Sequence, residues 1–367
     1  MVDTAAPPFR ADHVGSLLRP AALKDARRRY TDGTLDAAGL AAIEDREIER
    51  AIRKQQDLGL RGITDGELRR SWWHLDFLWG LDGIAEHAAD FAIGFVGATP
   101  RPAGVRIDGR IGFCGHPMLE HYRFLHDRVS AVPKLTIPAP SALTGRPVLP
   151  LIDSRVYPQR DAMFADLGEA YRKAVRAFAA AGCRYLQLDE VFIAMLCDGK
   201  YRDKMVARGD DPDALLHRYA TLINTAIADS PADMTVTLHL CRGNFKSTHM
   251  GAGGYETVQD VLFNEIGVHG YFMEYDDERS GGFEPLRLLP KGKRVALGLV
   301  TTKRAELERK DDLTRRIDEA AKHADLEQLS LTAQCGFAST EEGNLLTEDE
   351  QWRKLELIVA VAREVWG

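Results

Sequence analysis

The sequence lacks several features that mark whole classes of proteins. It has no run of about 18 apolar residues, the length that crosses a bilayer as a helix, and its start has neither the basic nor the apolar segment of a secretory signal. Its 48 basic and 55 acidic residues are interleaved and give a net charge of -7. Because nucleic-acid binding requires a basic surface, we expect neither nucleic acid nor membrane as a partner, and a cytoplasmic location.

Cysteine is also scarce. Five cysteines in 367 residues, an odd number spread along a long chain, do not form the disulfide framework of a small secreted protein. In a reducing compartment such residues are packed thiols, metal ligands or nucleophiles. We expect Cys114, Cys183 and Cys197 to be packed thiols, which leaves Cys241 and Cys335 as candidates for chemistry.

No Gly-x-Gly-x-x-Gly opens a helix after an early strand, which counts against a dinucleotide-binding sheet. Short apolar runs instead alternate with amphipathic segments, which predicts parallel strands joined by helices. Eight such units favour a single α/β domain over 1–367, a (β/α)8 TIM barrel, with an open doubly wound sheet as the competing arrangement. The predicted strands are 11–16, 62–67, 134–140, 183–190, 234–241, 271–276, 294–300 and 328–336, and the predicted helices are 35–58, 161–181, 212–228, 256–266, 313–324 and 348–365.

The stretch at about 68–133 is too long for one connection between the second and third strands. Its alternating pattern predicts an inserted β-hairpin that turns at Asp108-Gly109 and lies over the barrel mouth. The run 71–77 is either core or an aromatic wall of that mouth, and in the second case His74 and Asp76 face the substrate.

Titratable side chains gather where the predicted strands end, which is the active-site face of such a barrel. His239 and Cys241 are two residues apart on one strand, so they point to the same side. With Glu274 and Cys335 from later strands they offer one nitrogen, two sulfurs and one oxygen, a set that suits tetrahedral Zn²⁺. Taken alone, the His-x-Cys pair is more typical of a buried histidine and a packed thiol, and it is Glu274 and Cys335 at later strand ends that favour a metal site.

The sulfur content of this set points to a type of reaction. Two thiolates make zinc a poorer activator of water than a histidine-rich shell does. An electron-rich zinc is better suited to holding a substrate thiol, whose free pKa is near ~8.5, as a reactive thiolate. The ligand set therefore indicates S-alkylation.

Six motifs in order along the chain resemble the catalytic, C-terminal barrel of the cobalamin-independent methionine synthase family, and its short methionine synthase II-like members above all. The resemblance implies zinc at His239, Cys241, Glu274 and Cys335. It also implies an amino-acid thiol held by Gly15 and Ser16, with its ammonium on Glu67 and Asp189. The motifs are Asp12-His-Val-Gly-Ser16, Asp65-Gly-Glu67, Leu186-Gln-Leu-Asp-Glu190, His239-Leu-Cys241, Glu274-Tyr-Asp276 and Gln334-Cys-Gly336.

The sequence departs from the long synthases of that family at three points. Their N-terminal half, which helps to bind the folate, is missing. Their Asp-Ile-His-Ser-Pro segment, with a proton-moving histidine, is replaced by Gly298-Leu-Val-Thr-Thr302. Their Gly-Pro-Val-Thr segment and its following Trp become Pro138-Ala-Pro-Ser-Ala142. We therefore place His13, as a substitute proton donor, and Asp189 among the catalytic residues.

Several alternatives stay open. Glu67 and Asp189 either bind substrate or form a rim network with Arg69, Arg70 or Arg184. Arg242 and Asn244 either anchor a carboxylate or orient the metal ligands. The expected activity is methyl transfer to homocysteine from 5-methyltetrahydrofolate or a corrinoid carrier; the alternatives are a zinc thiol alkyltransferase or C-S lyase acting on another electrophile, such as an epoxide, and a metal-free decarboxylase-like barrel. A homodimer is compatible with the sequence.

Overall fold

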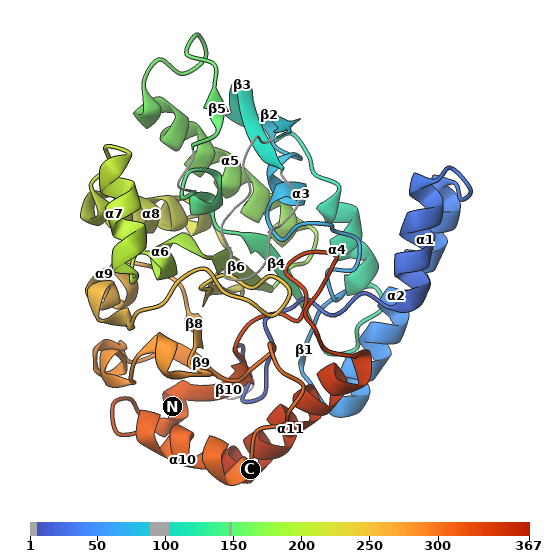
Figure 1. The fold of residues 1–367 in the computed structure, drawn as a ribbon, viewed down its shortest axis with the longest axis vertical. Helices are drawn as coiled ribbons and strands as arrows, with labels where there is room; N and C mark the ends of the chain where they lie inside the picture. Colours follow the sequence, from blue (N-terminus) through green and yellow to red (C-terminus); the bar gives the residue numbers. More distant parts are fainter. Residues whose placement is uncertain (1–5, 89–102, 147–148) are drawn as a thin grey trace.

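A computed structural model describes residues 6–88, 103–146 and 149–367. A seven-stranded parallel sheet forms its centre, and the strands curl around one another with the long helices outside them (Figure 1). In spatial order the strands are β1 (Gly62–Ile63), β4 (Val132–Pro138), β6 (Tyr185–Glu190), β7 (Thr235–Leu240), β8 (Gly270–Glu274), β9 (Arg294–Val300) and β10 (Leu329–Ala333).

The helices that follow the strands carry apolar residues on the face that covers the sheet. Local chemistry sets their ends: Asp36 caps the first long helix by accepting from Gly39 N–H, and Thr347 and Glu350 form a capping box at the last one. The six predicted helices are all present, but the fourth is divided into a 3-10 turn at Tyr255–Thr257 and a short helix. Their observed bounds are α2 (Ala37–Leu58), α5 (Arg160–Ala180), α8 (Pro212–Ile227), α9 (Gln259–Asn264), α10 (Lys310–Ala320) and α11 (Glu348–Trp366).

The prediction of a first strand at 11–16 is wrong. Residues 11–16 make a single parallel bridge, between Ala11 and Leu331 of β10. On the other side of this segment, Leu17 N–H donates to Gly66 O at 2.9 Å, and Thr64 Oγ1 donates to Gly15 O at 2.7 Å. The segment therefore connects the two edges of the curled sheet, and several of its other backbone groups bond to side chains, as when Gln187 Nε2 donates to Val14 O.

Two strands lie between β1 and β4 in the chain, β2 (Asp82–His87) and β3 (Gly104–Gly112), and they pair antiparallel. A third strand, β5 (Leu151–Ile152), comes after β4 and pairs parallel with β3. The predicted turn at Asp108-Gly109 is wrong, since both residues lie inside β3, where the pairing is irregular. Residues 89–102, between the two strands, lie outside the described residues. The expectation that this pair covers the mouth is not confirmed for its described part. β3 packs beside α5 and is joined to it by the Arg110–Asp166 ion pair. Ile111 N–H donates to the hydroxyl of Tyr157, which precedes α5.

The sequence analysis missed shorter helices, which lack a full period of apolar positions. Two of them, α3 and α6, follow strand ends and help to shape the site. Within the described ranges, no helix is both long enough and apolar enough to span a bilayer. The missed helices are α1 (Ala21–Thr31), α3 (Leu75–Leu78), α4 (Met118–His126), α6 (Phe192–Met195) and α7 (Gly199–Ala207).

Candidate metal centre and pocket

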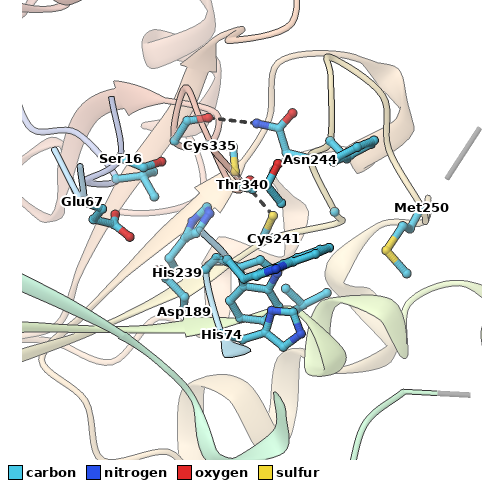
Figure 2. A pocket seen from close by; sticks show the side chains of 18 of the residues that line it. Ser16, Glu67, His74, Asp189, His239, Cys241, Asn244, Met250, Cys335 and Thr340 are labelled. Atoms are coloured by element: carbon cyan, nitrogen blue, oxygen red, sulfur yellow. Dashed lines mark hydrogen bonds between the residues drawn. The ribbon is translucent and has the colours of Figure 1, made fainter. Parts of the chain in front are cut away.

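Three of the four predicted metal ligands converge at the carboxyl ends of β7 and β10. His239 lies in β7, Cys241 directly follows that strand, and Cys335 comes two residues after β10. Their ligand atoms all lie within 4.8 Å of one another, and the two sulfurs are 3.4 Å apart. Figure 2 shows the imidazole and both sulfurs directed toward one another. Residues almost 100 positions apart in sequence thus form one cluster.

The cluster is buried, and its histidine has ring nitrogens without a hydrogen-bond partner among the described residues. His239, Cys241 and Cys335 are 2%, 6% and 4% exposed. Among the described residues neither ring nitrogen of His239 has a hydrogen-bond partner. A buried imidazole without a partner costs free energy that a bound ligand would recover. One nitrogen and two sulfurs with a fourth position left for substrate suit Zn²⁺, so the residues present fit this metal.

The protonation of the cluster favours metal binding. A hydrogen bond from Cys241 lowers the pKa of the Cys335 thiol well below its usual value, and it raises the pKa of Cys241 well above. Burial lowers the pKa of His239, but the nearby Cys335 sulfur and the carboxylates of Asp189 and Glu274 together outweigh burial and raise that pKa. The Cys335 thiol therefore ionises more readily than a free thiol, and the thiolate is the form that binds a metal.

Glu274, the fourth predicted ligand, lies outside this three-residue cluster. Its side chain at the end of β8 is fully buried, and burial raises its pKa. One carboxylate oxygen accepts the backbone N–H of Arg242 at 3.0 Å, and the other lies 3.4 Å from the Arg279 guanidinium. These contacts hold the carboxylate beside the backbone that follows Cys241, and the role of Glu274 as the fourth ligand stays a prediction.

The cluster forms part of the wall of a pocket that three predicted substrate-binding residues also line. Ser16, Glu67 and Asp189 contribute side chains to it (Figure 2). Asp189 is the register partner of His239 across β6 and β7, and Gln187 Nε2 donates to its carboxylate at 2.7 Å. Burial and the negative charge of Glu67 raise the pKa of Asp189 to about 7. Two carboxyl groups thus share a poorly solvated corner of the pocket.

The rim-network alternative holds in part. Arg70 pairs with Glu67, whereas Arg69 pairs with Glu44 and Asp45 and Arg184 pairs with Asp233. Within the described parts of the chain no ion pair to Asp189 is present. The Arg70 pair therefore covers one of the two acids, and Asp189 keeps its carboxylate directed at the pocket.

Two glycines allow the first segment to approach the site. A Cβ on Gly15, whose φ is +144°, would lie 2.8 Å from Glu67 Oε1. A Cβ on Gly336 would lie 2.0 Å from Ser16 Oγ. Gly15 does not line the pocket with its own atoms. Its contribution, together with that of Gly336, is to bring Ser16 and Glu67 close to the chain around Cys335.

The structure gives no support to His13 as a proton donor. His13 is 1% exposed, and it is not among the residues that line the pocket. Its Nε2 is 3.2 Å from Gly62 O. Burial and the nearby Lys134 cation lower the pKa of His13 to about 4, so its ring is neutral near pH 7.

The run 71–77 forms a wall of the pocket. Trp72, Trp73 and His74 line it, and the rings of Trp73 and His74 are 4.4 Å apart. Asp76 instead accepts the backbone N–H groups of Ser71 and Trp72, so it shapes the loop and does not face the substrate.

Asn244 and Arg242 both act on the geometry around the cysteines. Asn244 lines the pocket, and its Nδ2 donates to Gly336 O at 2.8 Å, which ties the chain after Cys241 to the chain after Cys335. The Arg242 guanidinium donates to Tyr255 OH and Gly253 O, away from the pocket. Of the two roles open from the sequence, orientation of the ligands is the one these contacts serve.

Sequence reasoning missed other lining residues, which lie on loops or, for Phe192, at the start of α6. Arg146 and Phe192 follow β4 and β6, and Phe245 and Met250 follow β7. The only signal for them was position, since each comes a few residues after a predicted strand end.

Comparison with known proteins agrees with this architecture. The family described as cobalamin-independent synthase, catalytic domain, matches residues 9–364. Two Bacillus subtilis proteins, both named as uncharacterized, are similar over nearly their whole length: YxjH is 46% identical and YxjG 47% identical, each match covering 98% of this chain and 95% of the relative.

Solved structures give the same result. A Listeria monocytogenes protein named as a candidate vitamin-B12-independent methionine synthase is 37% identical, with a TM-score of 0.79 and 98% of each chain covered. A B12-independent methionine synthase from Shewanella sp. W3-18-1, solved with selenomethionine, shares the fold at 18% identity, with a TM-score of 0.74 and 97% of each chain covered. The match along almost the entire chain shows that this protein belongs to the cobalamin-independent methionine synthase family.

Proposed function

We propose that the protein is a zinc-dependent methyltransferase that moves a methyl group from 5-methyltetrahydrofolate, or a related methyl carrier, to the sulfur of homocysteine and so forms methionine. The observation that carries this proposal is the buried cluster of His239, Cys241 and Cys335, whose ligand atoms lie within 4.8 Å of one another. We also propose that the curled sheet is a single (β/α)8 barrel in which residues 10–17 occupy the place of the first strand.

His239, Cys241 and Cys335 would hold the metal. When bound there, zinc would supply the positive charge that keeps a substrate thiol ionised at neutral pH, while the two thiolate ligands keep that sulfur nucleophilic. Glu274 and Asn244 keep the two cysteine-bearing loops in place through Arg242 N–H and Gly336 O. The support of the ligands by hydrogen bonds is a usual feature of metal sites.

The two acids of the pocket suit the ammonium of an amino-acid substrate. Burial first, and then the negative charge of Glu67, raise the pKa of Asp189, and a cation between the two acids would offset both effects. Ser16, brought close by Gly15 and Gly336, would bind the substrate carboxylate with its hydroxyl and backbone. Held in this way, the sulfur would face the methyl group in line with the bond that breaks, and the bonding electron pair would leave with the donor.

The test is turnover by the purified protein. Wild-type protein with L-homocysteine should form methionine with at least one of two methyl donors, 5-methyltetrahydrofolate or methylcobalamin, and the Cys335→Ser variant should form none. Methionine formation by the variant at the wild-type rate would contradict the role of the cluster. Failure of both donors with the zinc-loaded wild type would contradict the proposed reaction. The epoxide alternative predicts thioether formation with an epoxide instead, which the same assay can detect.

A further inference from the structure

Arg146 is a buried cation of the pocket that has few polar contacts with the described residues. Arg146 is 6% exposed and lines the pocket with Trp72, Trp73 and His74. Its guanidinium makes one hydrogen bond, to Ala103 O at 3.3 Å. No carboxylate within the described ranges forms an ion pair with it. Burial alone lowers the pKa of Arg146 to about 10, with no acid nearby to offset that cost.

Other buried arginines show that this is unusual. Arg19 donates to four backbone carbonyls, those of Leu17, Glu67, Arg70 and Ala338. Arg242 donates to Tyr255 OH and Gly253 O, both at 2.6 Å. Those guanidiniums hold loops together. Arg146 is also buried, at 6% exposed, but with its five N–H donors it makes only one hydrogen bond to the described residues. This is the arrangement expected of a guanidinium that binds an anionic ligand.

The backbone around Arg146 is fixed firmly enough to position the side chain. Tyr201 OH donates to Gly145 O, and Arg208 donates to the carbonyl of Arg146 itself. A Cβ on Gly145 would lie 2.1 Å from the Phe192 ring, so this ring packs directly on the preceding residue. A preorganised guanidinium loses less conformational entropy when it binds.

A second buried polar group accompanies Arg146. His74 is 2% exposed, lines the same pocket, and among the described residues has no hydrogen-bond partner at either ring nitrogen. Burial and the positive charges of Arg146 and Arg70 lower the pKa of His74 well below its usual value, so the ring is neutral. It therefore offers one N–H donor near the Arg146 guanidinium.

We propose that Arg146, assisted by His74, binds a carboxylate of the methyl donor and so selects a small carboxylated donor with a flat ring. This inference rests on the proposed function and adds a specificity-determining residue to it. The acceptor's charged groups have partners elsewhere, at Ser16, Glu67 and Asp189, whereas Trp73 and His74 form an aromatic surface beside Arg146 on which a ring can stack. A guanidinium matches a carboxylate with two parallel N–H donors.

The test measures the binding of defined probes by calorimetry. Wild-type, zinc-loaded protein is titrated with 5-methyltetrahydrofolate, with a tetrahydropterin that lacks the glutamate, and with L-homocysteine. Arg146→Met should weaken binding of 5-methyltetrahydrofolate at least about tenfold, the order expected for loss of a charge-assisted hydrogen bond. It should leave the dissociation constants of the tetrahydropterin and of homocysteine unchanged. Arg146→Lys, which keeps the charge but not the fork, should lie between.

The matched control is Arg155→Met. Arg155 is an exposed arginine on the same stretch of chain that pairs with Asp153, and its replacement should change none of the three values. The inference is overturned if wild-type protein does not bind 5-methyltetrahydrofolate, if Arg146→Met binds it as wild type does, or if the loss falls on homocysteine. Methionine formation with methylcobalamin alone would overturn the inference while leaving the proposed function intact, so the two failures are distinguishable.

Discussion

The two sides of the pocket are built differently. The sulfur side, His239, Cys241 and Cys335, stands at the ends of central strands, and contacts of Glu274 and Asn244 support it. The opposite side, Trp73, His74 and Arg146, stands on loops, and its polar groups have few protein partners. A supported cluster suits a resident ion, whereas unsatisfied groups on loops suit a ligand that comes and goes.

The largest effect should come from removing a sulfur. Cys335→Ser should lower zinc affinity by more than about 100-fold, beyond the 10- to 100-fold typical for loss of an outer supporting group, and should abolish methyl transfer. Zinc content after dialysis against a chelator measures this. Cys183→Ser, which alters an equally buried thiol away from the pocket, should keep its zinc. Retention of zinc by Cys335→Ser would remove Cys335 from the ligand set.

Glu274→Gln should have a smaller effect on the same side. An amide still accepts the N–H of Arg242 but loses the charge opposite Arg279, so zinc affinity should fall about tenfold. A competition titration with a chromogenic chelator measures the change. Glu308→Gln, which alters the partner of Lys354, is the control. A loss as large as that of Cys335→Ser would instead make Glu274 the fourth ligand.

On the opposite side, Trp73→Leu should weaken binding of 5-methyltetrahydrofolate about threefold to tenfold, since it removes a stacking surface worth about 0.5–1.5 kcal/mol. Zinc content should not change, which is what separates the two sides. Trp366→Leu, at the end of α11, is the control. Loss of zinc from Trp73→Leu would show that the sides are not independent.

The smallest effect concerns pH. The Glu190 carboxyl accepts the Ser141 hydroxyl and the N–H groups of Phe192 and Ile193, which fixes the start of α6. Burial raises the pKa of Glu190 from 4.5 to about 7. The folded state therefore holds this proton more tightly than the unfolded state, and the group's contribution to stability is lost as pH rises from about 4.5 to 7.

Glu190→Gln stays neutral and should lack this dependence. Urea denaturation gives the unfolding free energy of both proteins. Between pH 5 and pH 8, the unfolding free energy of the wild type should fall relative to that of Glu190→Gln. Titration of other groups is common to both proteins and cancels. A difference that is constant with pH would contradict the raised pKa.

The sequence predicted the strand-end side of the pocket better than the loop side. Strands β4 and β6 to β10 and the long helices showed clear periodicity, so the strand-end residues His239, Cys241 and Cys335 could be placed together from sequence. The first segment looked like a strand but forms one bridge, because hydrogen bonds to Leu331 and Gly66 satisfy it without a ladder. His13, predicted on that strand, is buried outside the pocket, where its ring faces Gly62 O. Arg146 had no periodic signal, because its position depends on contacts with Tyr201 and Arg208 that are distant in sequence.

The most direct test of the central claim is zinc X-ray absorption on the purified, zinc-loaded protein, before and after addition of homocysteine. The account predicts two sulfurs at about 2.3 Å and at least one nitrogen at about 2.0–2.1 Å, and a third sulfur when homocysteine is bound. Zinc with no sulfur neighbours, or a sulfur count that homocysteine does not change, would contradict it.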